Sequence, residues 1–240
     1  MISVVIPAHN EEKYIGKCLS AVKSAAKYVS DSVEIIVVAN RCTDKTVTIA
    51  KHFGARVLNN EDKCIAAIRN TGVKAAQGEI VITIDADSLM TKYSLAEIKE
   101  KLGSGIYVGG GTNPRFDRMS LGIAASTLYV AVNLIPVMLR NGGYLSGAMF
   151  WFRKSDFDAI GGFDESLISL EDMDFAKRLK AYGKLSGRKY GTLKKSYILT
   201  SARKFDEFGD WYLIKNRSLT KRIFTGKDRK AADEFYYDVR

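Results

Sequence analysis

Two pairs of acidic residues are the side chains in this sequence best suited to chemistry. The first, Asp85-Ala86-Asp87, directly follows the predicted strand Glu79–Ile84. Neighbouring carboxylates at a strand end repel each other. A hard cation such as Mg²⁺ or Mn²⁺ relieves that repulsion and shares its other ligand positions with substrate phosphates. The alternative is a solvated turn, but the apolar strand before the pair favours a site for a cation and a phosphorylated ligand.

The second pair, Glu171-Asp172, opens a predicted helix over Glu171–Tyr182. Acidic residues are common in a first helical turn because the helix dipole favours them there. A carboxylate at this place is also suited to accept the proton of an attacking hydroxyl group. We expect Asp172 to act as a general base and Glu171 to contact a phosphate or the attacking molecule.

Four basic residues are candidates for contact with a diphosphate. Lys63 and Arg69 precede the strand that ends at the first acidic pair, and Arg203 and Lys204 follow a short predicted strand near the end of the chain. Cationic side chains of this kind stabilise a departing diphosphate. The alternative, ordinary exposed charges on a basic surface, stays open for all four.

Strand and helix patterns alternate through the first half of the chain. Short apolar runs predict four strands, at Ile2–Ile6, Val33–Val38, Ala55–Leu58 and Glu79–Ile84, with amphipathic helices between them. This alternation predicts an α/β fold with a mainly parallel, twisted sheet flanked by helices.

Ligands of such a sheet bind beyond the carboxyl ends of its strands. That rule places Pro7–Glu11, Asn40–Asp44 and Asp85–Asp87 along one edge of the sheet. We expect His9 to line a nucleotide pocket at this edge.

Local signals refine the remaining elements. Asn10 is expected to cap the first helix, and Ser94-Leu95-Ala96-Glu97 has the form of a capping box. In the second half, the predicted strand Ile106–Thr112 contains three consecutive glycines, which permit close approach of a backbone or a ligand. A further strand is predicted at Ala148–Arg153, and the tail from about Phe205 is basic, aromatic and predicted to be helical.

The segment from Leu121 to Leu139 contains no charged residue. Its length fits a membrane span, but polar residues and a proline weaken that interpretation. A single span would also put Asp87 and Asp172 on opposite sides of the membrane, where they cannot serve one site. We therefore expect a buried or interfacial helix, which suggests an acceptor that is lipid-linked or delivered at a membrane surface. The alternative is a core helix beside the acceptor site.

Composition limits the other classes of function. The chain has 240 residues, 46% of them apolar, which suits a single large domain. Its formal charge of +10 suits a phosphorylated substrate or an anionic lipid surface, and a basic surface that is merely solvated is the alternative. Nucleic acid is not expected as a partner, because no RRM, KH or zinc-finger pattern is present.

The few cysteines and histidines also argue against several kinds of site. Three cysteines without CxxC spacing predict neither a disulfide framework nor a zinc site, and two histidines argue against a His-centred catalytic triad. The N-terminus enters a strand without the pattern of a signal peptide. The expected location is the cytoplasm, and the protein could there contact the inner face of the membrane peripherally.

Taken together, these segments resemble the family 2 glycosyltransferases of the GT-A fold. The resemblance covers residues 2–205 and depends on the order and spacing of its motifs. These motifs are Val5–Glu12 (VIPAHNEE), Asn40–Thr46 (NRCTDKT), Ala67–Asn70 (AIRN) with Gly78-Glu79, Asp85–Asp87 (DAD), and Gly161–Glu165 (GGFDE) followed by Glu171-Asp172.

The resemblance implies a single GT-A domain over 1–205, with a nucleotide-sugar-binding half at 1–112 and an acceptor-binding half at 113–205. Residues 206–240 form a basic helical extension. The implied activity is metal-dependent transfer of a sugar from a nucleoside-diphosphate sugar to a hydroxyl group, with inversion at the anomeric carbon. A UDP-sugar is favoured as donor and a GDP-sugar is the alternative.

The resemblance also implies roles for individual residues. Asp87 would bind the Mn²⁺ or Mg²⁺ that bridges the diphosphate, and Asp172 would be the catalytic base. The other implied contacts to the nucleotide sugar are Pro7, Ala8, His9, Glu11, Asn40, Lys63, Arg69, Asp85 and Ala86, with Glu171, Arg203 and Lys204 at the diphosphate or the acceptor.

The sequence departs from the family pattern in two respects. Ala39-Asn40-Arg41-Cys42 stands where Asp-Asp-Gly-Ser is usual, so an amide replaces a carboxylate that commonly accepts a hydrogen bond from the base, and guanine stays open. The Gln-x-x-Arg-Trp motif of processive synthases is absent, which favours a single transfer.

Two other functions remain as alternatives. One is a sugar-phosphate nucleotidyltransferase, although the glycine-rich loop that usually opens such enzymes is absent. The other is a non-catalytic relative that binds a nucleotide or a membrane.

Overall fold

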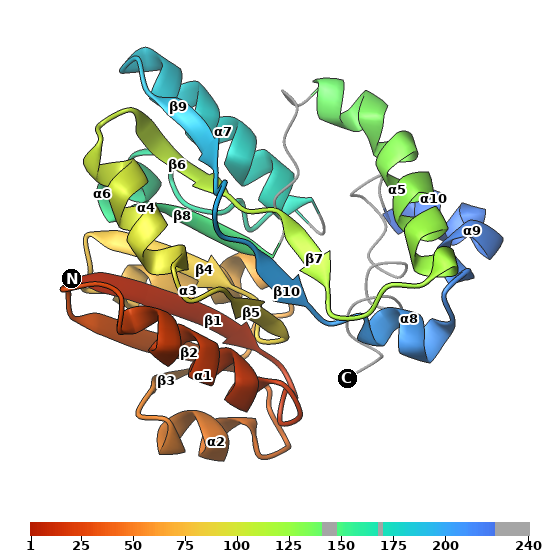
Figure 1. Cartoon of the computed structure of the whole chain (residues 1–240), viewed down its shortest axis with the longest axis horizontal. Coiled ribbons are helices and arrows are strands. Elements are labelled where there is room, and N and C mark those ends of the chain that lie inside the picture. The colour runs from red at the N-terminus through yellow and green to blue at the C-terminus, as the bar shows by residue number, and fades with distance from the viewer. Residues whose placement is uncertain (141–147, 168–169, 224–240) are drawn as a thin grey trace.

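A central sheet of seven strands forms the body of the molecule in the computed structural model, which describes residues 1–140, 148–167 and 170–223 (Figure 1). The described residues form ten strands, seven in this sheet and three in a smaller second sheet: β1 (Ile2–Ala8), β2 (Val33–Asn40), β3 (Arg56–Asn60), β4 (Ile80–Ile84), β5 (Ser88–Met90), β6 (Tyr107–Gly111), β7 (Pro114–Phe116), β8 (Met149–Arg153), β9 (Lys189–Thr192) and β10 (Ile198–Thr200). The helices are α1 (Ile15–Ala26), α2 (Thr46–His52), α3 (Ile65–Ala75), α4 (Ser94–Gly103), α5 (Leu121–Arg140), α6 (Lys154–Ala159), α7 (Glu171–Leu185), α8 (Arg203–Phe208), α9 (Tyr212–Lys215) and α10 (Arg217–Ile223).

The order of strands across the central sheet is β3-β2-β1-β4-β8-β6-β9. Strands β3, β2, β1 and β4 are parallel neighbours, as the alternating pattern of the first half predicts. Strand β8 is antiparallel to both β4 and β6, while β9 runs parallel to β6. The sheet is therefore mainly parallel, with one reversed strand contributed by the second half of the chain.

The alternation of side chains along β1 gives each face of the sheet its own core. Ile2, Val4 and Ile6 pack with α1 and α4, whereas Val5 packs on the opposite face with α3 and α7. Successive side chains of a strand point to opposite faces, so a strand that is buried along its whole length must be covered on both. The result is a three-layer arrangement, with α1 and α4 in front of the sheet and α3 and α7 behind it in Figure 1.

Two glycines allow the layers and strands to approach closely. A Cβ atom on Gly72 of α3 would lie 2.3 Å from Val5 Cγ1, so glycine lets this helix sit directly on β1. A Cβ atom on Gly110 would lie 2.1 Å from the carbonyl oxygen of Gly191 in β9. The close approach expected from the three glycines is therefore confirmed as strand packing.

The two predicted helix caps are wrong. Asn10 has a φ of 51°, and the residue before α1 is Tyr14, which makes no side-chain capping bond. Helix α4 begins at Ser94 without a side-chain cap. The carboxylate of Glu97 instead accepts hydrogen bonds from the backbone N–H groups of residues 194–196, so tertiary contacts replace the expected capping box.

A small second sheet connects the body to a helical unit. Strand β10 lies between β5 and β7 in this sheet and leads directly into α8. Helix α5 packs with α8, α9 and α10 through Val130, Leu213 and their neighbours, and Arg118 forms ion pairs with Asp206 and Asp210. We call α5 and α8–α10 the helical unit; Figure 1 shows it beside the central sheet.

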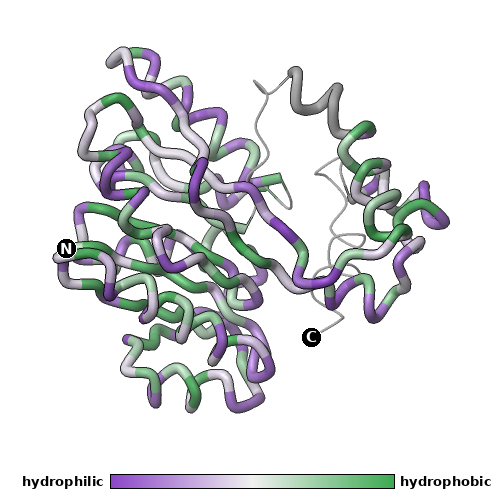
Figure 2. Tube along the Cα trace, viewed as in Figure 1, coloured by the Kyte–Doolittle hydropathy of each residue, from purple (hydrophilic) through white to green (hydrophobic). Residues whose placement is uncertain are grey.

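Helix α5 confirms the helix expected at 121–139 and is partly exposed. Leu121, Leu128 and Val132 are 82%, 65% and 54% exposed, whereas Ile123 and Ser126 are buried. The apolar character of the helix is visible in Figure 2. Among the helices in the described part of the chain, none combines the length and hydropathy required to cross a bilayer.

Candidate functional site

The carboxyl ends of β1, β2 and β4 meet at one edge of the sheet, as expected. Pro7 and Ala8 are buried at the end of β1, and the Nδ1 atom of His9 lies 2.6 Å from the carbonyl oxygen of Asn40 at the end of β2. The Sγ atom of Cys18 lies 3.7 Å from the carbonyl oxygen of Asp85. The parallel pairing of β1 with β2 and with β4 brings the three predicted segments together along one edge.

The side chain of Asn40 faces β3. Its Nδ2 atom donates to the carbonyl oxygens of Asn60 and Asp62, each at 2.8 Å, and Asn40 is 1% exposed. The sequence suggested an amide available to a nucleobase, whereas this amide is held within the protein. The difference arises because β3 ends beside Asn40 and offers carbonyl oxygens at short range.

Arg69 joins the two acidic pairs. Its Nη1 atom lies 2.7 Å from Glu171 Oε1, and its Nη2 atom lies 3.1 Å from Asp85 Oδ1. The Arg69 side chain is only 6% exposed, so the alternative of an ordinary surface charge is wrong for this residue. A buried guanidinium between carboxylates from distant segments holds β4 and α7 together at this edge.

Asp172 lies beside this ion pair in an unusual electrostatic environment. Burial and the neighbouring Glu171 carboxylate raise the pKa of Asp172 to about 7, and the charge of Arg69 offsets part of that rise. Its Oδ1 atom accepts a hydrogen bond of 2.7 Å from the backbone N–H of Met173. A carboxyl group with a pKa near neutrality is well matched to proton transfer.

Arg203 forms a similar bridge at Asp87, the second aspartate of the first acidic pair, and joins it to Glu11. Its Nη1 and Nη2 atoms contact the two carboxylate oxygens of Glu11 at 2.6 and 2.8 Å, and Nη2 also lies 2.8 Å from Asp87 Oδ2. Its guanidinium carbon lies 4.9 Å from the centre of the Tyr14 ring. The Glu11 carboxylate, expected to contact the nucleotide sugar, is bound to Arg203 in this structure.

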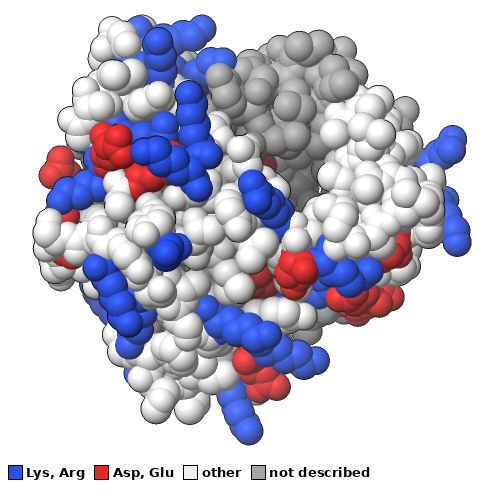
Figure 3. All heavy atoms as spheres, viewed as in Figure 1, with Lys and Arg blue, Asp and Glu red and all other residues white. Residues whose placement is uncertain are grey.

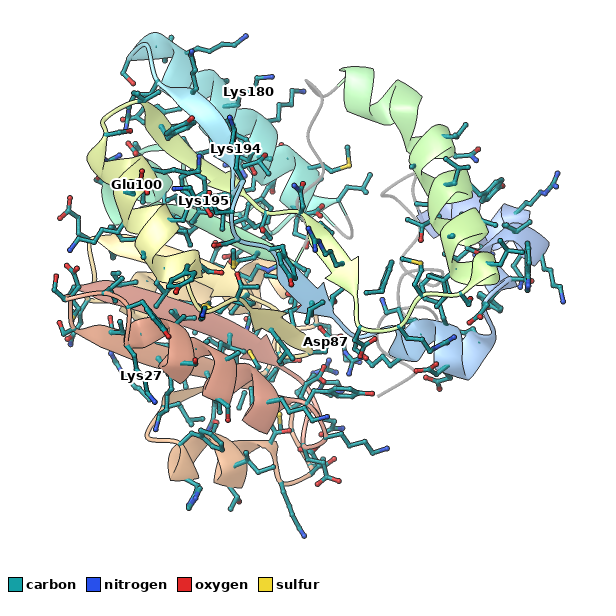
Figure 4. The ribbon with its side chains drawn as sticks, viewed as in Figure 1. Lys27, Asp87, Glu100, Lys180, Lys194 and Lys195 are labelled. Carbon is teal, nitrogen blue, oxygen red and sulfur yellow. The ribbon has the colours of Figure 1, made fainter. Side chains whose placement is uncertain are left out.

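The backbone of the second sheet places Arg203 beside Asp87. Strand β10 pairs with β5, which begins immediately after Asp87, and the N–H of Ser201 donates to the carbonyl oxygen of Asp87. The N–H of Ala202 donates to Asp117 Oδ1 at 2.9 Å. Figure 4 shows Asp87 at this junction of β5 and β10.

The remaining predicted residues occupy different settings. Ala86 is buried between the two aspartates, Lys63 is exposed in the connection between β3 and α3, and Lys204 is half-buried on α8. Contacts of Lys63 and Lys204 with a ligand stay predictions.

Three non-glycine residues with positive φ lie beside the site. Asn10, Arg41 and Leu170 have φ values of 51°, 48° and 65°. Asn10 follows β1, Arg41 follows β2, and Leu170 directly precedes the Glu171-Asp172 pair. Left-handed backbone at such residues costs free energy and concentrates at functional sites. Only Asn10 gave a sequence signal for this conformation, because asparagine tolerates it better than most residues.

The acidic residues fit a cation that takes most of its ligands from a substrate. In the described residues no group of three or more His, Cys, Asp or Glu side chains is arranged to hold a metal ion. Mg²⁺ is typically bound through one or two carboxylates, with phosphates and water completing its shell. The single Asp87 carboxylate, 15% exposed, matches that mode better than a closed protein site.

Comparisons with known proteins agree with the fold and the motifs. Residues 3–161 match the model of glycosyl transferase family 2. The glycosyltransferase AglE of Haloferax volcanii is 29% identical over 185 residues, covering 74% of this chain and 60% of that protein. The chain thus spans less than two thirds of this relative.

A second relative and a solved structure extend the comparison. A dolichyl N-acetylglucosaminyl phosphate diacetamidodideoxyglucuronosyltransferase of Methanococcus voltae is 27% identical and covers 72% of this chain and 57% of its own length. The glucosyl-3-phosphoglycerate synthase of Mycobacterium tuberculosis, solved with Mn²⁺ and UDP, has a TM-score of 0.60 at 20% identity, covering 92% of this chain and 79% of that one. This likeness confirms the α/β, mainly parallel GT-A-type fold in a single domain.

Proposed function

Because the chain belongs to glycosyl transferase family 2, we propose that it transfers a sugar from a nucleoside-diphosphate sugar to a hydroxyl acceptor with inversion. The observation that supports this best is the Arg69 bridge, which brings Asp85 and Glu171 within one ion-pair network. Family membership decides against a sugar-phosphate nucleotidyltransferase.

Asp172 is the proposed catalytic base. Its carboxylate takes the proton of the acceptor hydroxyl as that oxygen attacks the anomeric carbon, while the nucleoside diphosphate leaves from the opposite face. A single displacement of this kind inverts the anomeric centre. The neighbouring Glu171 is held by Arg69, so Asp172 is the member of the pair that is proposed to exchange the proton.

Asp87 is the proposed ligand of a divalent cation, Mn²⁺ or Mg²⁺. Such a cation, when bound, neutralises charge on the departing diphosphate. Arg203 lies at the same place and is proposed to contact the diphosphate, with Lys204 and Lys63 as further candidates. The Mn²⁺ in the mycobacterial structure supports this choice of cation.

UDP is the proposed nucleotide, with GDP as the alternative. Pro7, Ala8 and His9 line the edge where the base and ribose are proposed to lie. Residues 1–112 would thus bind the donor and 113–205 the acceptor, with 206–240 as a basic extension. We propose one transfer per binding event.

The acceptor is proposed to carry a lipid, and the protein to contact the cytoplasmic face of a membrane peripherally. Helix α5 supports this, because Leu121, Leu128 and Val132 follow one another along one exposed side of it. Exposed Lys215 and Arg217 on the neighbouring α9 and α10 suit an anionic surface, and blue side chains stand at that edge in Figure 3. The name of the Methanococcus voltae relative, which includes a dolichyl phosphate, agrees with this choice.

A thermal-shift screen of UDP- and GDP-sugars, with and without Mn²⁺, tests donor binding. A bound donor at 100 times its Kd stabilises the fold by about 2.7 kcal/mol. We expect a UDP-sugar with Mn²⁺ to raise the Tm, and Asp87→Asn to remove the Mn²⁺-dependent part of that shift. If no nucleotide sugar shifts the Tm, the proposed function is rejected; binding without release of UDP in the presence of candidate acceptors would indicate a non-catalytic relative.

A further inference from the structure

Arg203 forms an ion pair with the carboxylate of Asp87, which is the proposed ligand of the divalent cation. Its Nη2 atom lies 2.8 Å from Asp87 Oδ2, and both side chains are largely buried, at 16% and 15% exposed. A guanidinium and a divalent cation beside one carboxylate repel each other, and the repulsion is strong where water is scarce. Cation binding at Asp87 therefore has to work against Arg203.

Glu11 keeps Arg203 in place even without Asp87. The guanidinium contacts both oxygens of Glu11, whose side chain is 2% exposed, and the Tyr14 ring lies against its face. A bidentate, charge-assisted contact of this kind fixes both position and orientation. Giving up the single contact to Asp87 would leave Arg203 at the same edge, with Nη2 still bound to Glu11 and its other N–H able to donate to another anion.

We propose that Arg203 is a positioning residue that competes with the divalent cation for Asp87 and couples binding of that cation to binding of the nucleoside diphosphate. Without the nucleotide, Arg203 neutralises Asp87 and disfavours the cation. With the nucleotide, the diphosphate supplies negative charge to both Arg203 and the cation, so the repulsion is offset. The proposal rests on the proposed function for the identity of the two ligands.

The coupling between Mn²⁺ and UDP can be measured as the factor by which each ligand changes the affinity of the other. Linkage requires that UDP tighten Mn²⁺ binding by the same factor as Mn²⁺ tightens UDP binding. Direct contact between Mn²⁺ and the diphosphate already contributes to this factor in any variant. A variant with a neutral residue in place of Arg203 should therefore bind Mn²⁺ more tightly in the absence of UDP. Its coupling factor, the ratio of Mn²⁺ affinities with and without UDP, should be smaller than that of the wild type.

Titrations of Mn²⁺ by electron paramagnetic resonance, with and without saturating UDP, test the proposal without any turnover. We expect Arg203→Gln to bind Mn²⁺ alone about tenfold more tightly than the wild type, and its coupling factor to be at least about fivefold smaller. Arg203→Lys keeps the charge but cannot bind Glu11 and Asp87 with one planar fork, so its coupling factor should lie between the two.

Arg188→Gln is the matched control. Arg188 also forms a bidentate pair, with Asp156 at 2.7 and 2.9 Å, and its side chain is similarly covered at 19% exposed. Asp156 and Arg188 lie on α6 and in the connection from α7 to β9, so losing this pair should leave the coupling factor unchanged.

Equal coupling in the wild type and Arg203→Gln would overturn the inference while leaving the proposed function intact. Failure of the wild type to bind UDP at all would instead reject the proposed function and this inference with it. If Arg203→Gln does not fold, Arg203→Lys decides, and a coupling factor equal to that of the wild type would overturn the proposal.

Discussion

Two largely buried arginines organise the site at the scale of single residues. Arg69 lies between Asp85 and Glu171, and Arg203 lies between Glu11 and Asp87. Each arginine thus neutralises carboxylates that come from segments far apart in the chain. Asp172 is the nearby carboxyl group whose pKa is raised to about 7, which singles it out for proton transfer.

The chemistry of these residues was predictable from the sequence, but their partners were not. Paired acids at the end of an apolar strand and at a helix start were enough to identify Asp85, Asp87 and Asp172. The pairing of Arg69 with Glu171 depends on how α3 packs beside α7, and no local pattern contains that information. For the same reason the sequence did not reveal that Glu11, expected to contact the nucleotide sugar, pairs with Arg203.

Asp172→Asn should slow transfer strongly while retaining donor binding. General-base catalysis contributes about 10²–10⁴-fold, so we expect a fall in kcat of at least about 100-fold with little change in the Kd for UDP. For the wild type, kcat/KM should rise with pH as Asp172 loses its proton, with a midpoint near the pKa of about 7. A variant that turns over at the wild-type rate would contradict the assignment.

The same substitution should stabilise the protein at high pH. The folded pKa of Asp172, about 7, exceeds its unfolded value near 3.8, so the stability from this group is present at low pH and is lost as the pH rises through 7. Asn carries no such cost, and we expect Asp172→Asn to gain about 1–3 kcal/mol over the wild type in urea unfolding at pH 8 and less at pH 5.

Asp174→Asn on the same helix is the control for that gain. Asp174 pairs with Arg178 at 2.6 Å, so its loss removes an ion pair and should not stabilise the protein at either pH. Equal gains in the two variants would show that the effect is not specific to Asp172.

At the scale of elements, periodicity predicted the strands well and the caps poorly. The apolar runs at β1, β2, β3 and β4 are strands within a few residues of the expected ranges. Ser94 and Glu97 matched a capping box, yet Glu97 binds the backbone of the segment before β10. A capping pattern describes a local choice, and the tertiary contact provides three N–H donors instead of one.

Glu97→Gln should therefore weaken the segment that leads into β10 and Arg203. Loss of the charge-assisted bonds to residues 194–196 is expected to cost about 1–3 kcal/mol in urea unfolding. Burial alone would raise the pKa of Glu97, but these hydrogen bonds lower it below the usual value of a glutamate. Their contribution to the free energy of unfolding is therefore present above the usual pKa of a glutamate and is lost as the pH falls through the lowered pKa. Glu100→Gln, on the exposed side of the same helix, should be nearly neutral; equal losses would contradict this account.

At the scale of the whole molecule, the first half of the sheet followed from sequence and the second half did not. Alternating strands and helices require crossover connections, which make β1, β2, β3 and β4 parallel; their order in the sheet comes from the structure. Strand β8 was predicted as a strand, but its antiparallel place between β4 and β6 depends on long-range pairing that its own residues do not specify. The second sheet has short strands, and β10 reaches Asp87 only through that tertiary pairing.

The helical unit gives a test of membrane contact for the entire protein. We expect the wild type to float with vesicles of phosphatidylglycerol and phosphatidylcholine, and Leu128→Glu with Val132→Glu to weaken that binding at least about tenfold. Burial of an apolar side chain of this size contributes about 1.5–3 kcal/mol. High salt should weaken binding further, because exposed Lys215 and Arg217 contribute electrostatically.

Leu185→Glu is the control for that experiment. Leu185 is 87% exposed at the end of α7 and is not part of the helical unit, so its replacement should leave flotation unchanged. Absence of wild-type protein from floated vesicles of either charge would reject membrane contact. A shift from dimer to monomer in the double variant would instead identify a second copy of the chain as the occupant of this surface.

The most direct measurement is the anomalous scattering of Mn²⁺ in crystals grown with UDP. We expect one strong peak about 2 Å from a carboxylate oxygen of Asp87 and in contact with the diphosphate. The uracil ring should lie at the edge formed by β1 and β2, and the space beyond the diphosphate should be open toward Asp172. A nucleotide bound elsewhere, or a peak away from Asp87, would show that the two acidic pairs do not serve one donor site.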